Sequence, residues 1–156
     1  METNTCCFIG HRTIEETQEL KTTLYETIER LITNEKIDTF LFGSKSQFND
    51  LCLALVTEIK EKYPQIKRVY VRAEYPYIND DYNNYLLTYY EDTYYPPKAT
   101  NAGKASYIQR NFEMIEKSRF CLIYYDEEAI PNNRKSGTKI ALDYAKKQNK
   151  NIILFP

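Results

Sequence analysis

Ser136-Gly137-Thr138 is the stretch of sequence from which the fold is inferred. It lies between an apolar, strand-like run that ends in Tyr124-Tyr125-Asp126 and a helical pattern over residues 140–147. A glycine-centred turn between a buried strand and a helix leaves backbone N–H groups unpaired at the start of the helix. These groups, together with the positive end of the helix dipole, bind phosphate and other anions. By itself the triplet is more typical of an ordinary turn with a helix N-cap.

Two further turns of the same kind follow two other strand-like runs. Gly10-His11-Arg12 follows the apolar residues 6–9, and Gly43-Ser44-Lys45 follows residues 39–42. The complete pattern predicts five strands, at residues 6–9, 39–42, 68–72, 120–125 and 151–155. Apolar residues at helical spacing predict intervening helices over about 13–33, 48–63, 104–116 and 138–147. The first of these helices is expected to begin with a capping box formed by Thr13 and Glu16.

Strands that alternate with helices predict a single α/β domain over residues 1–156, a Rossmann-like three-layer sandwich. Its five-stranded sheet is expected to be mainly parallel, with helices on both faces. In such folds the carboxyl ends of the strands meet at one edge, where ligands bind. Gly10, Gly43, Arg72 and Asp126 each lie at the carboxyl end of a predicted strand, so we expect all four to converge on one crevice.

Residues 74–100 form an insertion after the third strand that is rich in tyrosine. The segment contains eight of the fifteen tyrosines, and a helix over 79–90 is expected within it. Long insertions in compact domains are commonly functional. Three interpretations remain open: core packing, a self-association surface, and a lid on which Tyr89 or Tyr95 stacks against a nucleobase. Tyr107, just beyond the insertion, is a further stacking candidate.

Composition limits the possible partners. The formal net charge is −1, so duplex nucleic acid is an unexpected partner. The four cysteines lie in apolar runs without metal-ligand spacing, which predicts buried free thiols, a cytoplasmic location and no metal. No apolar run approaches the ~20 residues of a membrane span. We expect no cofactor. We expect the chain to form a dimer or a higher homo-oligomer.

Five motifs in order resemble the SLOG superfamily, in particular small bacterial and phage proteins with a Gly-His-Arg start. They are Phe-Ile-Gly-His-Arg (8–12), Gly-Ser-Lys-Ser-x-Phe-Asn-Asp (43–50), Tyr-x-x-Arg-Asn (107–111), Tyr-Tyr-Asp (124–126) and Ser-Gly-Thr-x-x-Ala (136–141). The resemblance covers essentially the whole chain. It implies a Rossmann-like sheet that binds nucleotides or nucleotide-derived signals, as in DNA-processing proteins and sensors of antiphage defence.

The same resemblance extends to phosphoribohydrolases that release cytokinin bases, whose signature is Gly-Gly-x-Gly-Thr-x-x-Glu with a catalytic Glu. Ala141 stands here in the place of that Glu. A methyl group cannot act as an acid or a base, so we expect ligand binding and assign no catalytic residue. Glu113, Glu116, Asp126 and Asp143 are the carboxylates that would have to replace it in an enzyme.

The candidate ligand-binding residues combine the three turns with cations and polar groups near them. They are Gly10, His11, Arg12, Gly43, Ser44, Lys45, Arg72, Arg110, Asn111, Asp126, Ser136, Gly137 and Thr138. The turns would hold phosphates, the arginines would neutralise charge, and Asn111 and Asp126 would bind a sugar or base. Each has a plainer alternative: packing for His11, structural ion pairs for the arginines, loop capping for Asp126.

The sequence therefore predicts a binder of an ADP-ribose-like or cyclic-nucleotide signal, acting as a sensor or as a sequestering protein in conflict between phage and host. One alternative is a nucleoside-phosphate N-glycosidase with a rearranged carboxylate. The other is a protein-interaction or single-stranded DNA-binding module.

Overall fold

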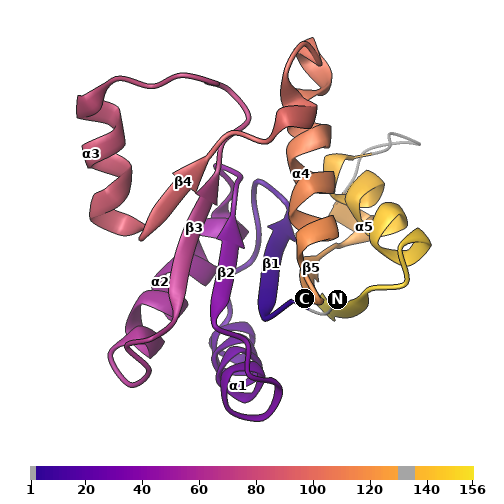
Figure 1. Ribbon diagram of the computed structural model, residues 1–156. Helices are drawn as coiled ribbons and strands as arrows, with labels where there is room; N and C mark the ends of the chain where they lie inside the picture. The colour runs from indigo at the N-terminus through magenta and orange to yellow at the C-terminus, as the bar shows by residue number, and fades with distance from the viewer. Residues whose placement is uncertain (1–2, 130–135) are drawn as a thin grey trace.

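The computed structural model describes residues 3–129 and 136–156. Within them the chain forms six β-strands, five α-helices and three short 3₁₀ helices (Figure 1). The strands are β1 (Thr5–Gly10), β2 (Thr39–Phe42), β3 (Lys67–Val71), β4 (Asp92–Tyr94), β5 (Phe120–Tyr124) and β6 (Asn151–Phe155). The helices are α1 (Gln18–Glu35), α2 (Gln47–Lys60), α3 (Asp80–Tyr89), α4 (Ser106–Lys117) and α5 (Gly137–Lys147), with 3₁₀ turns η1 (Pro97–Ala99), η2 (Gly103–Ala105) and η3 (Glu127–Ala129).

All six strands form one parallel sheet in the order β4-β3-β2-β1-β5-β6. The chain first winds outward from β1 to β4 and then returns to β5 on the other side of β1. The reversal places the topological switch point between β1 and β5, where this class of sheet binds ligands. Cys7 of β1 lies opposite Cys121 of β5, and Gly10 lies opposite Tyr124 at the carboxyl ends.

Helices cover both faces of the sheet, which gives the predicted three-layer sandwich (Figure 1). Successive residues of β1 point to opposite faces, so that Phe8 packs in one core cluster and Ile9 in the other. The first cluster contains the apolar stripes of α1 and α2, and the second contains those of α4 and α5. All four cysteines are buried free thiols, as predicted.

The predicted start of the first helix is wrong. Thr17, not Thr13, is the N-cap of α1, because its hydroxyl accepts a hydrogen bond from the Leu20 N–H at 3.0 Å. The preceding segment is held against α2 in a non-helical conformation. Gln47 accepts from the Ile14 N–H at 3.1 Å and donates to Glu16 at 2.6 Å. Glu16 thus binds a neighbouring helix and does not reach back to a capping residue.

The strand count of five is also wrong, because β4 lies inside the tyrosine-rich insertion. It extends the sheet beyond β3, with Tyr70 opposite Thr93 in register. The predicted helix in the insertion is α3, and Asn79 caps it by accepting from the Tyr82 N–H at 2.8 Å. The insertion therefore forms the outer edge of the sheet together with a helix that stands beside it (Figure 1). Among the described residues, no helix is long and apolar enough to cross a membrane.

Candidate functional site

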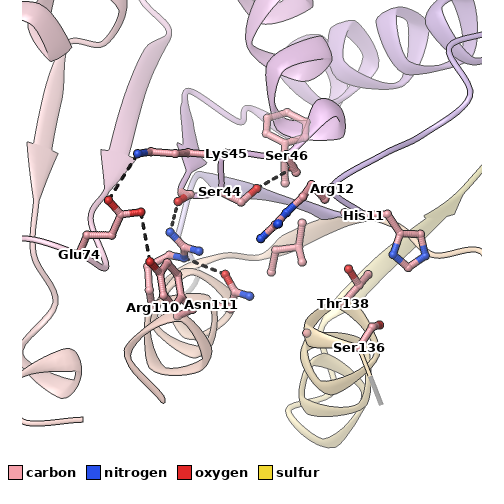
Figure 2. Close-up of a pocket in the computed structure, with 16 residues that line it drawn as sticks. His11, Arg12, Ser44, Lys45, Ser46, Glu74, Arg110, Asn111, Ser136 and Thr138 are labelled. Atoms are coloured by element: carbon pink, nitrogen blue, oxygen red, sulfur yellow. Dashed lines mark hydrogen bonds and ion pairs between the residues drawn. The ribbon is translucent and has the colours of Figure 1, made fainter. Parts of the chain in front are cut away.

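A cavity of about 710 Å³ opens at the carboxyl edge of the sheet. The loops after β1 and β2 and the first turns of α4 and α5 surround it (Figure 2). Twelve of the predicted ligand and stacking residues line it: Gly10, His11, Arg12, Gly43, Ser44, Lys45, Tyr107, Arg110, Asn111, Ser136, Gly137 and Thr138. The sheet topology brings these residues together from four separate parts of the sequence.

The start of α5 lies at this cavity. Ser136 is the N-cap, and its hydroxyl accepts from the Lys139 N–H at 3.0 Å. No described residue accepts a hydrogen bond from the N–H of Gly137 or Thr138. A Cβ at Gly137 would meet no atom within 4 Å. The triplet is therefore a helix cap, and within the described part of the chain it also offers two unpaired backbone donors.

Arg110 is the buried cation of the cavity. Only 4% of its surface is exposed, and burial lowers the pKa of its guanidinium. Nη1 donates to the Gly43 carbonyl and Nε donates to Asn111 Oδ1 at 2.9 Å. No carboxylate among the described residues forms an ion pair with it. Glu74 acts on it electrostatically without a direct ion pair. A buried charge with no direct ion pair among the described residues favours binding of an anion, because a bound anion would offset the cost of its desolvation.

Two more cations and one carboxylate complete the charges of the cavity. Figure 2 shows the Arg12 side chain extending between the Ser44–Ser46 loop and the start of α5, and no described side chain bonds to it. Lys45 pairs with Glu74 at 3.4 Å. Glu74 also accepts from the Tyr107 hydroxyl at 3.2 Å. Three cationic side chains against one carboxylate make the lining positive in a chain whose formal net charge is −1.

His11 lies at the switch point as a hydrogen-bond acceptor. Its Nε2 accepts from the Asp126 N–H at 2.8 Å, which requires that this nitrogen carry no proton. Burial lowers the pKa of the imidazole from its usual 6.5. The ring also packs edge-on against Tyr124, with centroids 5.9 Å apart. Through this hydrogen bond, His11 connects the loop after β1 to the loop after β5 at the cavity wall.

Four predicted residues do not belong to the lining. Arg72 donates to the carbonyls of Tyr75 and Pro76 and to the Thr93 hydroxyl, and therefore clamps the insertion. Asp126 caps its own loop by accepting from the Glu128 N–H at 3.0 Å. Tyr95 donates to the Ala99 carbonyl, and Tyr89 lines a different hollow.

Glu74 and Ser46 line the cavity although neither was a predicted ligand-binding residue. Ser46 is the N-cap of α2 and shares a hydrogen bond of 2.7 Å with Ser44. The sequence could have predicted that Ser46 begins the helix, since a serine directly before an apolar helical pattern is a typical N-cap. Glu74 had a weaker signal, because it lies three residues beyond β3 at the start of the insertion.

The other carboxylates considered for catalysis lie outside the cavity lining. Glu113 accepts from the Tyr94 hydroxyl at 3.0 Å, and Glu116 pairs with Lys98 and accepts from Tyr144. Asp143 pairs with Lys139 on α5. Ala141 lies on α5, is 1% exposed and packs in the hydrophobic core. In residues 3–129 and 136–156, no cluster of three or more His, Cys, Asp or Glu could hold a metal ion.

A family model described as the YspA SLOG family matches residues 8–155. The match includes every residue that lines the cavity. The search of curated proteins found no match.

Proposed function

The chain belongs to the YspA SLOG family, and we propose that its cavity binds a nucleotide-derived small molecule, such as an ADP-ribose-like or cyclic-nucleotide signal. In this proposal the protein senses or sequesters that molecule. The observation that carries the proposal is Arg110, a buried guanidinium in the cavity lining that has no carboxylate partner among the described residues.

The phosphates of the ligand would lie between Arg110 and the start of α5. The free amides of Gly137 and Thr138 would donate to phosphate oxygens, and Arg12 would add a charge from the opposite wall. Ser44 and Asn111 supply hydroxyl and amide groups suited to a ribose or to further phosphate oxygens. A cavity of about 710 Å³ has the volume typical of pockets for ligands of this size.

The shared cavity is tested with two variants on opposite walls. ADP-ribose, cyclic nucleotides and nucleoside monophosphates are screened by isothermal titration calorimetry, and the tightest ligand is titrated into Arg12→Ala and Gly137→Asp. We expect both variants to lose at least about 10-fold in affinity, since each loses a charge-assisted contact or gains a repulsive carboxylate. Gly137→Asn has nearly the same shape as the Asp variant without its charge, so it should bind more tightly than Gly137→Asp. Loss in only one of the two cavity variants would contradict a shared site.

A second candidate function rests on Glu74, which is the one carboxylate in the cavity lining as described. Hydrolysis of an N-glycosidic bond needs a carboxylate at the site, and Glu74 is placed to supply it. Glu74 contacts Lys45 at 3.4 Å and the Tyr107 hydroxyl at 3.2 Å there. Incubation with nucleoside monophosphates and NAD-type dinucleotides, followed by chromatography for free base, separates the two functions. Base release that Glu74→Gln abolishes would establish the enzyme.

A further inference from the structure

We propose that the planar ring of the ligand, such as a nucleobase, binds in a second hollow under α3, which we call the tyrosine hollow. It has a volume of about 330 Å³ and is lined by Tyr70, Tyr82, Tyr85, Tyr89 and Tyr90 together with Leu53, Leu86 and four polar residues. The inference rests on the proposed function, because it places the ring of a ligand whose phosphates occupy the main cavity.

The floor of the tyrosine hollow consists of buried, packed side chains, whereas its wall is a helix with few buried residues. Tyr70 and Tyr90 form the floor, are 9% and 7% exposed, and pack with their ring centroids 5.2 Å apart. The wall is α3, which has Leu86 as its one buried residue. Figure 1 shows α3 standing beside the sheet at the end of a long connection. A helix held in this way leaves room between its tyrosines and the floor.

The tyrosines of α3 have exposed ring surface that intramolecular packing does not use. Tyr85 is 58% exposed and Tyr89 is 47% exposed, although both lie at the hollow. Tyr82 and Tyr85 lie nearly parallel, with centroids 6.2 Å apart and an angle of 13° between the rings. Aromatic faces of this kind are the usual partners of nucleobases in stacking contacts.

The tyrosine hollow adjoins the main cavity. Ser44 and Lys45 line both. A small hollow of about 10 Å³ shares Tyr70 and Tyr82 with the tyrosine hollow and Glu74 and Arg110 with the main cavity. A nucleotide with phosphates at Arg110 can therefore direct its sugar past Lys45 and its base toward α3.

Charge also distinguishes the two compartments. The main cavity holds the cations Arg12 and Arg110, whereas aromatic and apolar side chains predominate in the tyrosine hollow. Lys45 stands at the boundary, where its pairing with Glu74 leaves 70% of its side chain exposed. A molecule with an anionic end and a planar aromatic end matches this arrangement; free inorganic phosphate matches only half of it.

The test compares ligands with and without a base. ADP, GDP, CDP, UDP and inorganic pyrophosphate are titrated by calorimetry into the wild type, Tyr85→Ala/Tyr89→Ala, Gly137→Asp and Tyr77→Ala. Tyr77 is 92% exposed on the insertion and does not line the hollow, so its variant controls for loss of a surface tyrosine. Circular dichroism and sedimentation velocity of each variant report folding and self-association.

We expect at least one nucleoside diphosphate to bind the wild type more tightly than pyrophosphate. Tyr85→Ala/Tyr89→Ala should lower that affinity roughly 5- to 150-fold, the range of one stacked base, without changing the affinity for pyrophosphate. Tyr77→Ala should bind as the wild type does, and Gly137→Asp should lose every probe.

Two results would overturn the inference while the proposed function survives. One is nucleotide binding that Gly137→Asp removes but Tyr85→Ala/Tyr89→Ala leaves unchanged. The other is loss of self-association in the tyrosine variant with unchanged nucleotide affinity, which would assign the hollow to a second copy of the chain. A wild type that binds none of the probes, pyrophosphate included, would overturn both proposals.

Discussion

Gly10, Gly43 and Gly137 all line the cavity, but the lack of a Cβ has a different consequence at Gly137 than at the other two. A Cβ at Gly10 would lie 2.4 Å from the Phe48 ring, and a Cβ at Gly43 would lie 2.6 Å from Arg110 Cδ. These two glycines make room for neighbouring side chains, and Gly43 thereby determines where Arg110 lies. A Cβ at Gly137 would meet no described atom within 4 Å, so this glycine does not make room for a neighbouring side chain of the described residues.

Gly43→Ala should therefore destabilise the fold, by about 1–3 kcal/mol, because the new methyl group overpacks Arg110 and Met114. Urea denaturation followed by circular dichroism measures the change. Gly137→Ala is the matched control and should leave the free energy of unfolding unchanged or slightly higher, since alanine is the better helix former. Equal stability of the two variants would show that the contact at Gly43 relaxes without cost.

His11 should make stability depend on pH. Its folded-state pKa lies below 6.5, so the unfolded chain binds the proton first as the pH falls. Stability is then fully present above pH 6.5 and decreases as the pH falls toward the lower, folded pKa. Denaturation between pH 7.5 and 5 should show this decrease in the wild type and a smaller one in His11→Gln, whose amide oxygen can still accept from Asp126. Parallel curves for the two proteins would contradict the assignment.

For individual residues, the sequence predicted which ones lie near the cavity better than it predicted what each side chain contacts there. Residues that follow parallel strands lie at the binding edge of the sheet, which is why Gly10 and Gly43 with their neighbours could be brought together in advance. The role of Arg72 could not be predicted, because its partners are the Tyr75 and Pro76 carbonyls of the insertion. Backbone partners within an irregular segment leave no signal in the sequence.

Among the helices and strands, α4 buries polar side chains that its apolar pattern does not indicate. Apolar residues at helical spacing predicted a helix over about 104–116, yet the residues that α4 buries include Arg110 and Glu113. Ile115 is fully buried, whereas Phe112 stacks on Tyr144 with centroids 3.9 Å apart. The helix thus buries a polar stripe toward the cavity and the insertion, which a hydrophobic pattern alone does not reveal.

The strand β4 could not be predicted from its own residues, because Asp92-Thr93-Tyr94 has neither the length nor the apolar character of a buried strand. It exists because of long-range contacts. Arg68 on β3 binds Glu91 through Nε at 3.0 Å and Nη2 at 2.6 Å, and its N–H donates to the same carboxylate. The failed capping box at Thr13 has the same kind of cause, since Gln47 on α2 determines the conformation there.

Glu91→Gln should loosen the edge of the sheet. The neutral amide cannot form the two charge-assisted bonds to Arg68, which costs about 1–2 kcal/mol for a partly buried pair. Hydrogen exchange should then become faster in β4 and α3 while the rates in β1 and β5 stay unchanged. Glu29→Gln, which removes the pairing of α1 with Lys62, is the control and should not affect exchange in β4. Unchanged exchange at residues 92–94 in Glu91→Gln would show that Arg68 does not hold the insertion.

For the molecule as a whole, the doubly wound topology explains how a chain with nearly balanced charge has a cavity with a positive lining. The reversal between β1 and β5 gathers Arg12, the β2–α2 loop, Arg110 and the start of α5 around one cavity, whose described lining includes Glu74 as its one carboxylate. The fold and the position of the cavity followed from the order of strands, turns and helices in the sequence. The tyrosine hollow did not, because it depends on how α3 stands relative to β3.

The central claim is that the cavity holds a nucleotide-derived ligand through its phosphates. Native mass spectrometry of the wild type and of Gly137→Asp, purified from the same cells, tests it most directly. The account predicts that the wild type carries a phosphate-containing ligand with the mass of a nucleotide derivative, which fragmentation identifies, and that Gly137→Asp is folded but carries none. The same nucleotide retained by both proteins in equal amount would contradict it.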